Sequence, residues 1–169
     1  KLDYKMNIAL CLYGHVGIPG PASDRKTEDL SKESIEATTD PKYAAYSFRQ
    51  QILQRYNTSV FIHTWSTDQM ETLAKLYEPT MAIYEPQIDF TGSLEDYGII
   101  GDNIQDWKVS EDAKKGYEFL LPSRGSVAKI KDEMQRQIFR SRSRWYSTQK
   151  SIQLKAMFER KSGQVFDLV

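Results

Sequence analysis

Apolar residues gather in four short runs along the chain, at residues 7–13, 60–65, 81–85 and 165–169. The first runs are continuous in apolar character rather than alternating, which is typical of strands buried on both faces of a parallel sheet. Helical periods lie between the runs, and this order predicts parallel pairing with right-handed crossovers. We therefore expect an α/β fold, with a mostly parallel sheet and flanking helices.

Two helices are predicted between the first three runs. Asp40 and Pro41 have the residue types of an N-cap and a first helical position, and an apolar stripe follows them. Ser66 and Gln69 have the spacing of a capping box for the second helix, which Pro79 ends.

The second half of the chain reads as an insertion followed by a long helical region. Residues 86–125 show no sustained period, so we expect a long excursion from the core, either a lid or a two-stranded insertion. A helical stripe returns after Ser126, and Gly163 is a suitable terminator. On a helical wheel Trp145, Ile152 and Ala156 cluster, and the apolar sector extends past half the circumference, which predicts a deeply packed helix. The other residues of this sector are Tyr146, Met157, Leu154 and Phe158.

Composition narrows the classes of function. The 169 residues amount to one domain, and the 23 basic residues balance the 23 acidic ones, so no global field attracts nucleic acid or an anionic membrane. The single cysteine, Cys11, excludes an intrachain disulfide, and no run reaches the roughly 20 apolar residues of a membrane span. We expect a cytoplasmic protein that captures any anionic ligand at a local site.

Candidate chemistry lies where the first two strands end. Ligands of parallel sheets bind at the carboxyl ends of strands, which here carry Tyr13, Gly14 and His15, and then His63 and Trp65. Glycine lets the backbone approach a ligand with its N–H groups exposed. Each ring also has a structural interpretation: His15 as an exposed loop residue, His63 as a hydrogen-bonded core histidine, Trp65 as a cap on the sheet.

Lys150 falls inside the apolar sector of the last helix rather than among its charged neighbours. A lysine on a packed face needs an anionic partner or a route to solvent. Either its stem extends past the core to water, or its ammonium contacts a phosphate at the sheet edge. The two histidines form no zinc-binding pattern.

Several of these stretches together resemble a known family. "IALCLYGH", "VFIHTWS", "YEP" after the third run and "WYSTQKSIQL" before "FDLV" are similar in order and spacing to the glycosyltransferases of large viruses, phages and bacterial polysaccharide loci. The resemblance covers nearly the whole chain. It implies a Rossmann-like, GT-A-like nucleotide-sugar-binding half over residues 1–169, with Gln149 and Lys150 joining Tyr13, Gly14, His15, His63 and Trp65 as nucleotide-binding residues.

The resemblance also implies a divalent metal, Mn or Mg, in the complete enzyme. Its acidic motif would follow the fourth run, so we expect residues 1–169 to hold no metal tightly and to be inactive alone. The partners it implies are a nucleoside-diphosphate sugar and an acceptor of unknown identity. The alternative is a non-catalytic nucleotide- or protein-binding module that has lost the metal site.

Overall fold

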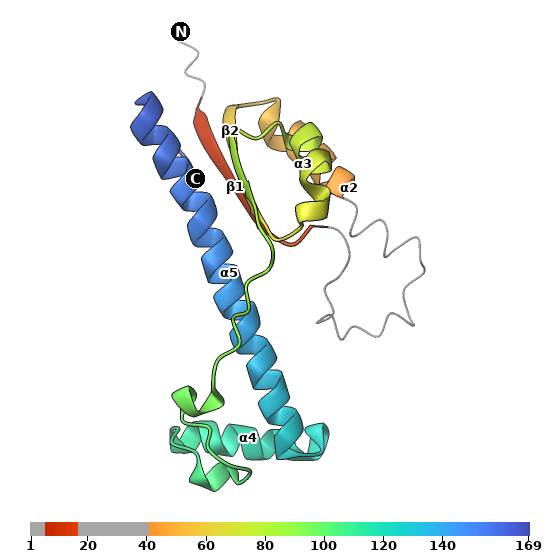
Figure 1. The fold of residues 1–169 in the computed structure, drawn as a ribbon, viewed down its shortest axis with the longest axis vertical. Coiled ribbons are helices and arrows are strands. Elements are labelled where there is room, and N and C mark those ends of the chain that lie inside the picture. Colours follow the sequence, from red (N-terminus) through yellow and green to blue (C-terminus); the bar gives the residue numbers. More distant parts are fainter. Residues whose placement is uncertain (1–5, 17–40) are drawn as a thin grey trace. The chain divides into compact units, whose positions relative to one another are not determined.

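The computed structural model describes residues 6–16 and 41–169. These form two compact units, one made of 6–16, 41–87 and 144–169, and the other of 88–143. The first unit contains a three-stranded parallel sheet in the order β1-β2-β3 (Figure 1). Its strands are β1 (Asn7–Gly14), β2 (Asn57–Thr64) and β3 (Met81–Tyr84). The predicted α/β class is therefore confirmed, with a small parallel sheet and flanking helices.

The fourth predicted strand, at residues 165–169, is wrong as an element. Leu168 makes an isolated parallel bridge with Ile8, and no strand is assigned there in the described chain. The backbone N–H of Ala9 donates to Leu168 O at 2.9 Å, on the edge of β1 away from β2. The run reaches the predicted sheet edge but pairs there at one residue.

Two helices cover one face of this sheet. α2 (Pro41–Phe48) begins at the predicted proline and continues as a π-helical turn over Arg49–Leu53, while Asp40 lies outside the described residues. A 3-10 turn, Thr67–Gln69, leads into α3 (Met70–Tyr77). The buried cluster on this face comprises Ala45, Val60, Ile62, Leu73 and Tyr77.

The predicted capping box is wrong, because the Ser66 hydroxyl is used elsewhere. It accepts from the backbone N–H of Val16 at 2.9 Å and donates to Val16 O at 3.0 Å. No side-chain cap bond forms at the start of the 3-10 turn. A tertiary contact has therefore displaced the local one that the spacing suggested.

The opposite face is covered by residues 144–162 of α5 (Val127–Ser162). Leu154 packs with Ala9, Phe61 and Phe166 in a buried cluster. The predicted packed sector is confirmed at Leu154 and Phe158 but is wrong at its centre, because Trp145 is 75% exposed and Ile152 is 46% exposed. Fully buried Ser147 and Ser151 occupy the face toward the sheet instead. The small serine side chains let the helix backbone approach the strands. A helical wheel weighted by hydrophobicity does not identify a face that is packed through serines.

The second unit holds the predicted insertion and the beginning of α5. It contains 3-10 turns at Leu94–Tyr97 and Ile104–Asp106 and the helix α4 (Glu111–Arg124). Its buried core comprises Leu94, Ile99, Ile104, Trp107 and Ile130, with Val127, Met134 and Ile138 packed against it as the stripe predicted. Gly116 and Pro122 lie inside α4 and obscured its period in the sequence.

Candidate functional site

Three chain segments meet where the strands of the first unit end. Gly14 pairs with Thr64 at the last position of the β1–β2 ladder. Beyond the ladder, Trp65 N donates to Gly14 O at 3.3 Å, and Glu85 N donates to Thr64 O at 3.1 Å. The carboxyl ends of all three strands therefore lie along one edge of the sheet, as parallel pairing requires.

His63 is fully buried at this edge and is held from both sides of its ring. Its Nδ1 lies 2.5 Å from Ser147 Oγ on α5, and its Nε2 lies 2.8 Å from Glu85 Oε1. The backbone N–H of Gly14 also donates to Ser147 Oγ, at 3.1 Å. Ser147 thus joins the ends of β1 and β2 to the helix, and His63 joins them to Glu85.

Serine, histidine and glutamate in a row resemble a nucleophilic triad, but their burial argues against one. Ser147 and His63 each expose 0% of their surface. A nucleophilic hydroxyl has to reach the reacting atom of a substrate, and Ser147 Oγ is enclosed and already bonded to two groups. We therefore assign Ser147 and His63 to positioning Glu85.

Aromatic rings and one cation surround the same edge. Trp65 stacks on Tyr146, with ring centroids 5.4 Å apart and an interplanar angle of 24°. His63 meets the Trp65 ring edge-on at 4.6 Å. The Lys150 ammonium lies 5.1 Å from the centre of the Tyr146 ring, within the range of a cation–π interaction. The ammonium is therefore directed toward the strand ends along Tyr146.

Glu85 is the ionisable group on which these contacts converge. Its burial acts to raise the pKa of the carboxyl, but hydrogen bonds from His63 and Tyr146 and the charges of His63 and Lys150 lower that pKa below the ordinary value. The side chain remains 30% exposed. The site thus presents a charged, partly accessible carboxylate beside an ammonium.

The expectation that the glycine turn offers free N–H groups is wrong for two of its residues. Gly14 N–H donates to Ser147 and Val16 N–H donates to Ser66, so both are taken by the fold. Glycine is still favoured at position 14 because its φ is +109°, a backbone conformation that other residues rarely adopt. Space is not the reason, since an added Cβ would meet no atom within 4 Å. An anion at this edge would depend on side chains instead.

The remaining predicted site residues are exposed. Tyr13 is 44% exposed beside His63 in the strand register. His15 Nε2 lies 2.8 Å from Gln87 Oε1 at the surface, and Gln149 is exposed on α5. The structure therefore brings Gly14, His63, Trp65 and Lys150 around one edge, with Tyr13 and His15 near its rim.

The list of predicted site residues left out three members of this cluster. Glu85, Tyr146 and Ser147 supply the carboxylate, the stacking ring and the central hydroxyl. Glu85 had an available signal, because it directly follows the third apolar run, at a strand's carboxyl end. Tyr146 and Ser147 lie in the stretch WYSTQKSIQL that carries the resemblance, but their contacts could not be predicted because their partners are distant in sequence.

Neither metal ligands nor a membrane-spanning helix is found in the described ranges. No group of three or more His, Cys, Asp or Glu side chains in residues 6–16 and 41–169 is placed to hold a metal ion. Among those same residues, no helix combines the length and apolar character needed to cross a bilayer.

Comparisons of the chain with protein-family models, with curated proteins and with solved structures found no match.

Proposed function

We propose that this chain is the nucleotide-binding part of a nucleotide-sugar-dependent glycosyltransferase, which moves a sugar from a nucleoside diphosphate to a glycan or other acceptor. The observation that carries the proposal is the cluster of Glu85, Tyr146 and Lys150 at the carboxyl ends of three parallel strands. Open parallel sheets bind their ligands at this edge.

The order in which the chain builds its sheet supports the choice of edge. β2 and β3 are added on one side of β1, whereas Leu168 bridges its other side. A further strand on that side would make β1 the point where the direction of strand addition reverses, and Rossmann-like sheets bind nucleotides in the crevice at such a point. Gly14 ends β1 at this point.

Each group of the cluster suits one part of a sugar nucleotide. The Lys150 ammonium would pair with a diphosphate oxygen, an interaction that is stronger than a neutral hydrogen bond. The Glu85 carboxylate, kept charged by its neighbours, would accept hydrogen bonds from ribose or sugar hydroxyls. An aromatic face beside them, from the exposed Tyr13, would stack on a base, whereas Trp65 is 5% exposed and already stacks on Tyr146.

Calorimetric titration with uridine and guanosine diphosphates tests the proposal. We expect saturable binding that Lys150→Ala weakens by about 1.5–3 kcal/mol, the contribution of a hydrogen bond to a charged group, with little loss of stability. Lys161→Ala, an exposed lysine on the same helix, is the matched control and should bind as the original does. Equal affinities in Lys150→Ala and the original protein would refute the role of this edge. If the protein binds neither uridine diphosphate nor guanosine diphosphate, the proposal as a whole is overturned.

A further inference from the structure

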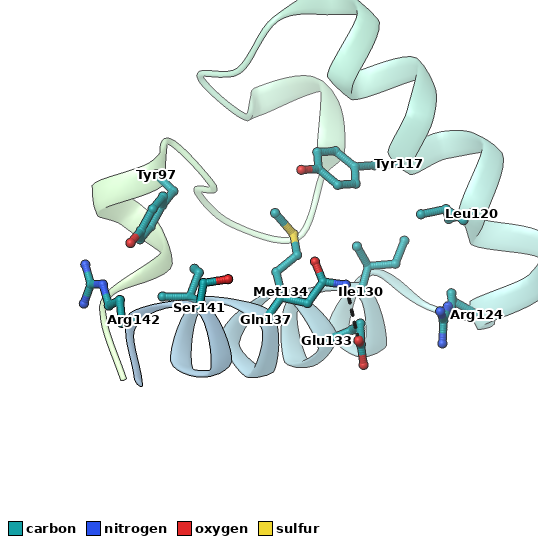
Figure 2. A pocket seen from close by; sticks show the side chains of 11 residues that line it. Tyr97, Tyr117, Leu120, Arg124, Ile130, Glu133, Met134, Gln137, Ser141 and Arg142 are labelled. Atoms are coloured by element: carbon teal, nitrogen blue, oxygen red, sulfur yellow. Dashed lines mark hydrogen bonds between the residues drawn. The ribbon is translucent and has the colours of Figure 1, made fainter. Parts of the chain in front are cut away.

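The second unit contains a pocket of about 540 Å³, within the size range of small-molecule sites. It lies between α4 and residues 130–142 of α5, entirely within residues 88–143 (Figure 2). Leu120 from α4 and Ile130, Met134 and Ile138 from α5 supply its apolar surface. The twelve steps of helix from residue 130 to residue 142 correspond to roughly 18 Å, so the pocket is extended along α5.

One end of the pocket is polar and carries hydrogen-bond donors. Tyr97, Ser141 and Arg142 line this end, and Figure 2 shows Tyr97 and Arg142 side by side there. The Arg142 guanidinium lies 5.6 Å from the centre of the Tyr97 ring. A Cβ added to Gly92 would lie 2.7 Å from Arg142 Nη1, so the guanidinium lies against the Gly92 backbone as well as the ring. The cation is thereby held in place before any ligand arrives.

The charges around the pocket favour an anion. Arg124 and Arg142 line it, and the acid among its described lining residues is Glu133. That carboxylate is already bonded by Arg136 at 3.1 Å and by Gln137 at 3.3 Å. Burial acts to raise its pKa, but these bonds and the Arg136 and Arg140 charges lower it, so Glu133 stays ionised and engaged. The arginines therefore leave positive charge available to a ligand.

We propose that this pocket binds an anionic amphiphile, a chain-like apolar body ending in a carboxylate or phosphate. The apolar chain lies along Met134, Ile138 and Ile130, and the acid group meets Arg142 at the polar end. Tyr117, fixed by an edge-on contact with Trp107 at 5.2 Å, forms the wall facing α5. The proposal does not depend on nucleotide binding, because all of these residues belong to the second unit.

Two ligands with the same chain but different charge test the idea: decanoate and decanamide. Calorimetry should show decanoate binding at least about tenfold more tightly, as expected for loss of a hydrogen bond to a charged group. In nitrogen–proton NMR spectra, the indole signal of Trp107 should shift with decanoate while that of Trp65 does not. Equal binding of the two ligands, or no binding of decanoate, would overturn the proposal.

Variants of the polar end separate the ligand contact from folding. Arg142→Met keeps the apolar stem and removes the charge, and we expect it to lose about tenfold in decanoate affinity. Gly92→Ala keeps the charge but displaces the guanidinium, and it should also weaken binding. Arg144→Met, an exposed arginine outside the lining, is the control and should bind normally. Unchanged affinity in both Arg142→Met and Gly92→Ala would contradict the assignment.

A second arm distinguishes a free acid from a lipid headgroup. Vesicles of phosphatidylglycerol in phosphatidylcholine are sedimented with the protein and with Arg142→Met. Co-sedimentation that the variant loses would assign the occupant to an anionic lipid, whereas decanoate binding without co-sedimentation would assign it to a free acid. Co-sedimentation equal in both proteins, together with failure to bind decanoate, would reject the pocket as the site.

Discussion

His63 Nδ1 and Ser147 Oγ lie 2.5 Å apart, although 84 residues separate them in the sequence. Both side chains are fully buried, so the contact lies inside the protein rather than on a surface open to substrate. It attaches α5 to the end of β2, and the Gly14 N–H attaches the end of β1 to the same oxygen. The geometry of the candidate site therefore depends on a polar contact within the core.

Removing the Ser147 hydroxyl should destabilise the protein strongly for so small a change. In Ser147→Ala, Gly14 N–H and one His63 nitrogen lose their partner in a buried place, which costs about 1–3 kcal/mol. Ser141→Ala, at an exposed position on the same helix, should change stability by about 0.5 kcal/mol or less. Urea denaturation followed by circular dichroism measures both, and similar values for the two variants would contradict the assigned role.

The free energy of unfolding should depend on pH in the acidic range because of Glu85. Its folded pKa is lowered, so its contribution is fully present above its ordinary pKa of 4.5 and is lost as the pH falls through the lowered value. We therefore expect the original protein to be more stable than Glu85→Gln at pH 7 and the difference to be smaller at pH 3, below the ordinary pKa. Unfolding free energies at the two pH values provide the measurement. A gap that stays constant or widens in acid would show that the Glu85 charge is not stabilised by its neighbours.

Two glycine substitutions should act in opposite directions. Gly14→Ala forces an alanine into φ of +109°, where strain costs about 1–3 kcal/mol although a Cβ has space. Gly116→Ala replaces a glycine inside α4, also with space, and should stabilise by about 0.5–1 kcal/mol through helix propensity. Thermal melts of both variants compare them directly. A neutral Gly14→Ala would show that the turn relaxes without glycine.

The two candidate faces of α5 can be compared by substitution. Leu154 is 4% exposed in the cluster against the sheet, so Leu154→Ala should cost about 2–5 kcal/mol. Trp145 is 75% exposed, so Trp145→Gln should cost about 0.5 kcal/mol or less despite its greater loss of apolar area. Chemical denaturation would decide between the faces. A larger loss from Trp145→Gln would restore the part of the helical-wheel prediction that centred on Trp145 and Ile152.

The strands were predictable because burial on both faces leaves a continuous apolar run in the sequence. The start of β2 was harder to predict, because this strand begins with three polar residues, Asn57, Thr58 and Ser59, ahead of the apolar run. Pro41 and Gly163 marked helix boundaries through backbone restrictions that act locally, and α2 begins and α5 ends beside them as predicted. Features that depend on neighbours in sequence were thus recovered best.

The candidate site was predicted only in part, because its main contacts join distant segments. Gly14, His63 and Trp65 could be found as residues at strand ends. The bonds of His63 to Glu85 and Ser147 depend on how β3 and α5 pack, which no local pattern encodes. The packed face of α5 was predicted only in part for a related reason: buried serines are satisfied by hydrogen bonds, and hydrophobicity does not measure them.

The buried serines of α5 recur every four residues, at 143, 147 and 151. Sliding α5 by four residues, about 6 Å, would therefore place another serine opposite His63, and this hydrogen bond cannot by itself distinguish the native register from its neighbours. Tyr146 does distinguish them, because the same slide would put Arg142 or Lys150 where its ring stacks on Trp65. The Trp65–Tyr146 pair thus specifies the register of α5 against the sheet, which the equivalent serines do not. We therefore expect a variant without the Tyr146 ring to populate a helix shifted by four residues.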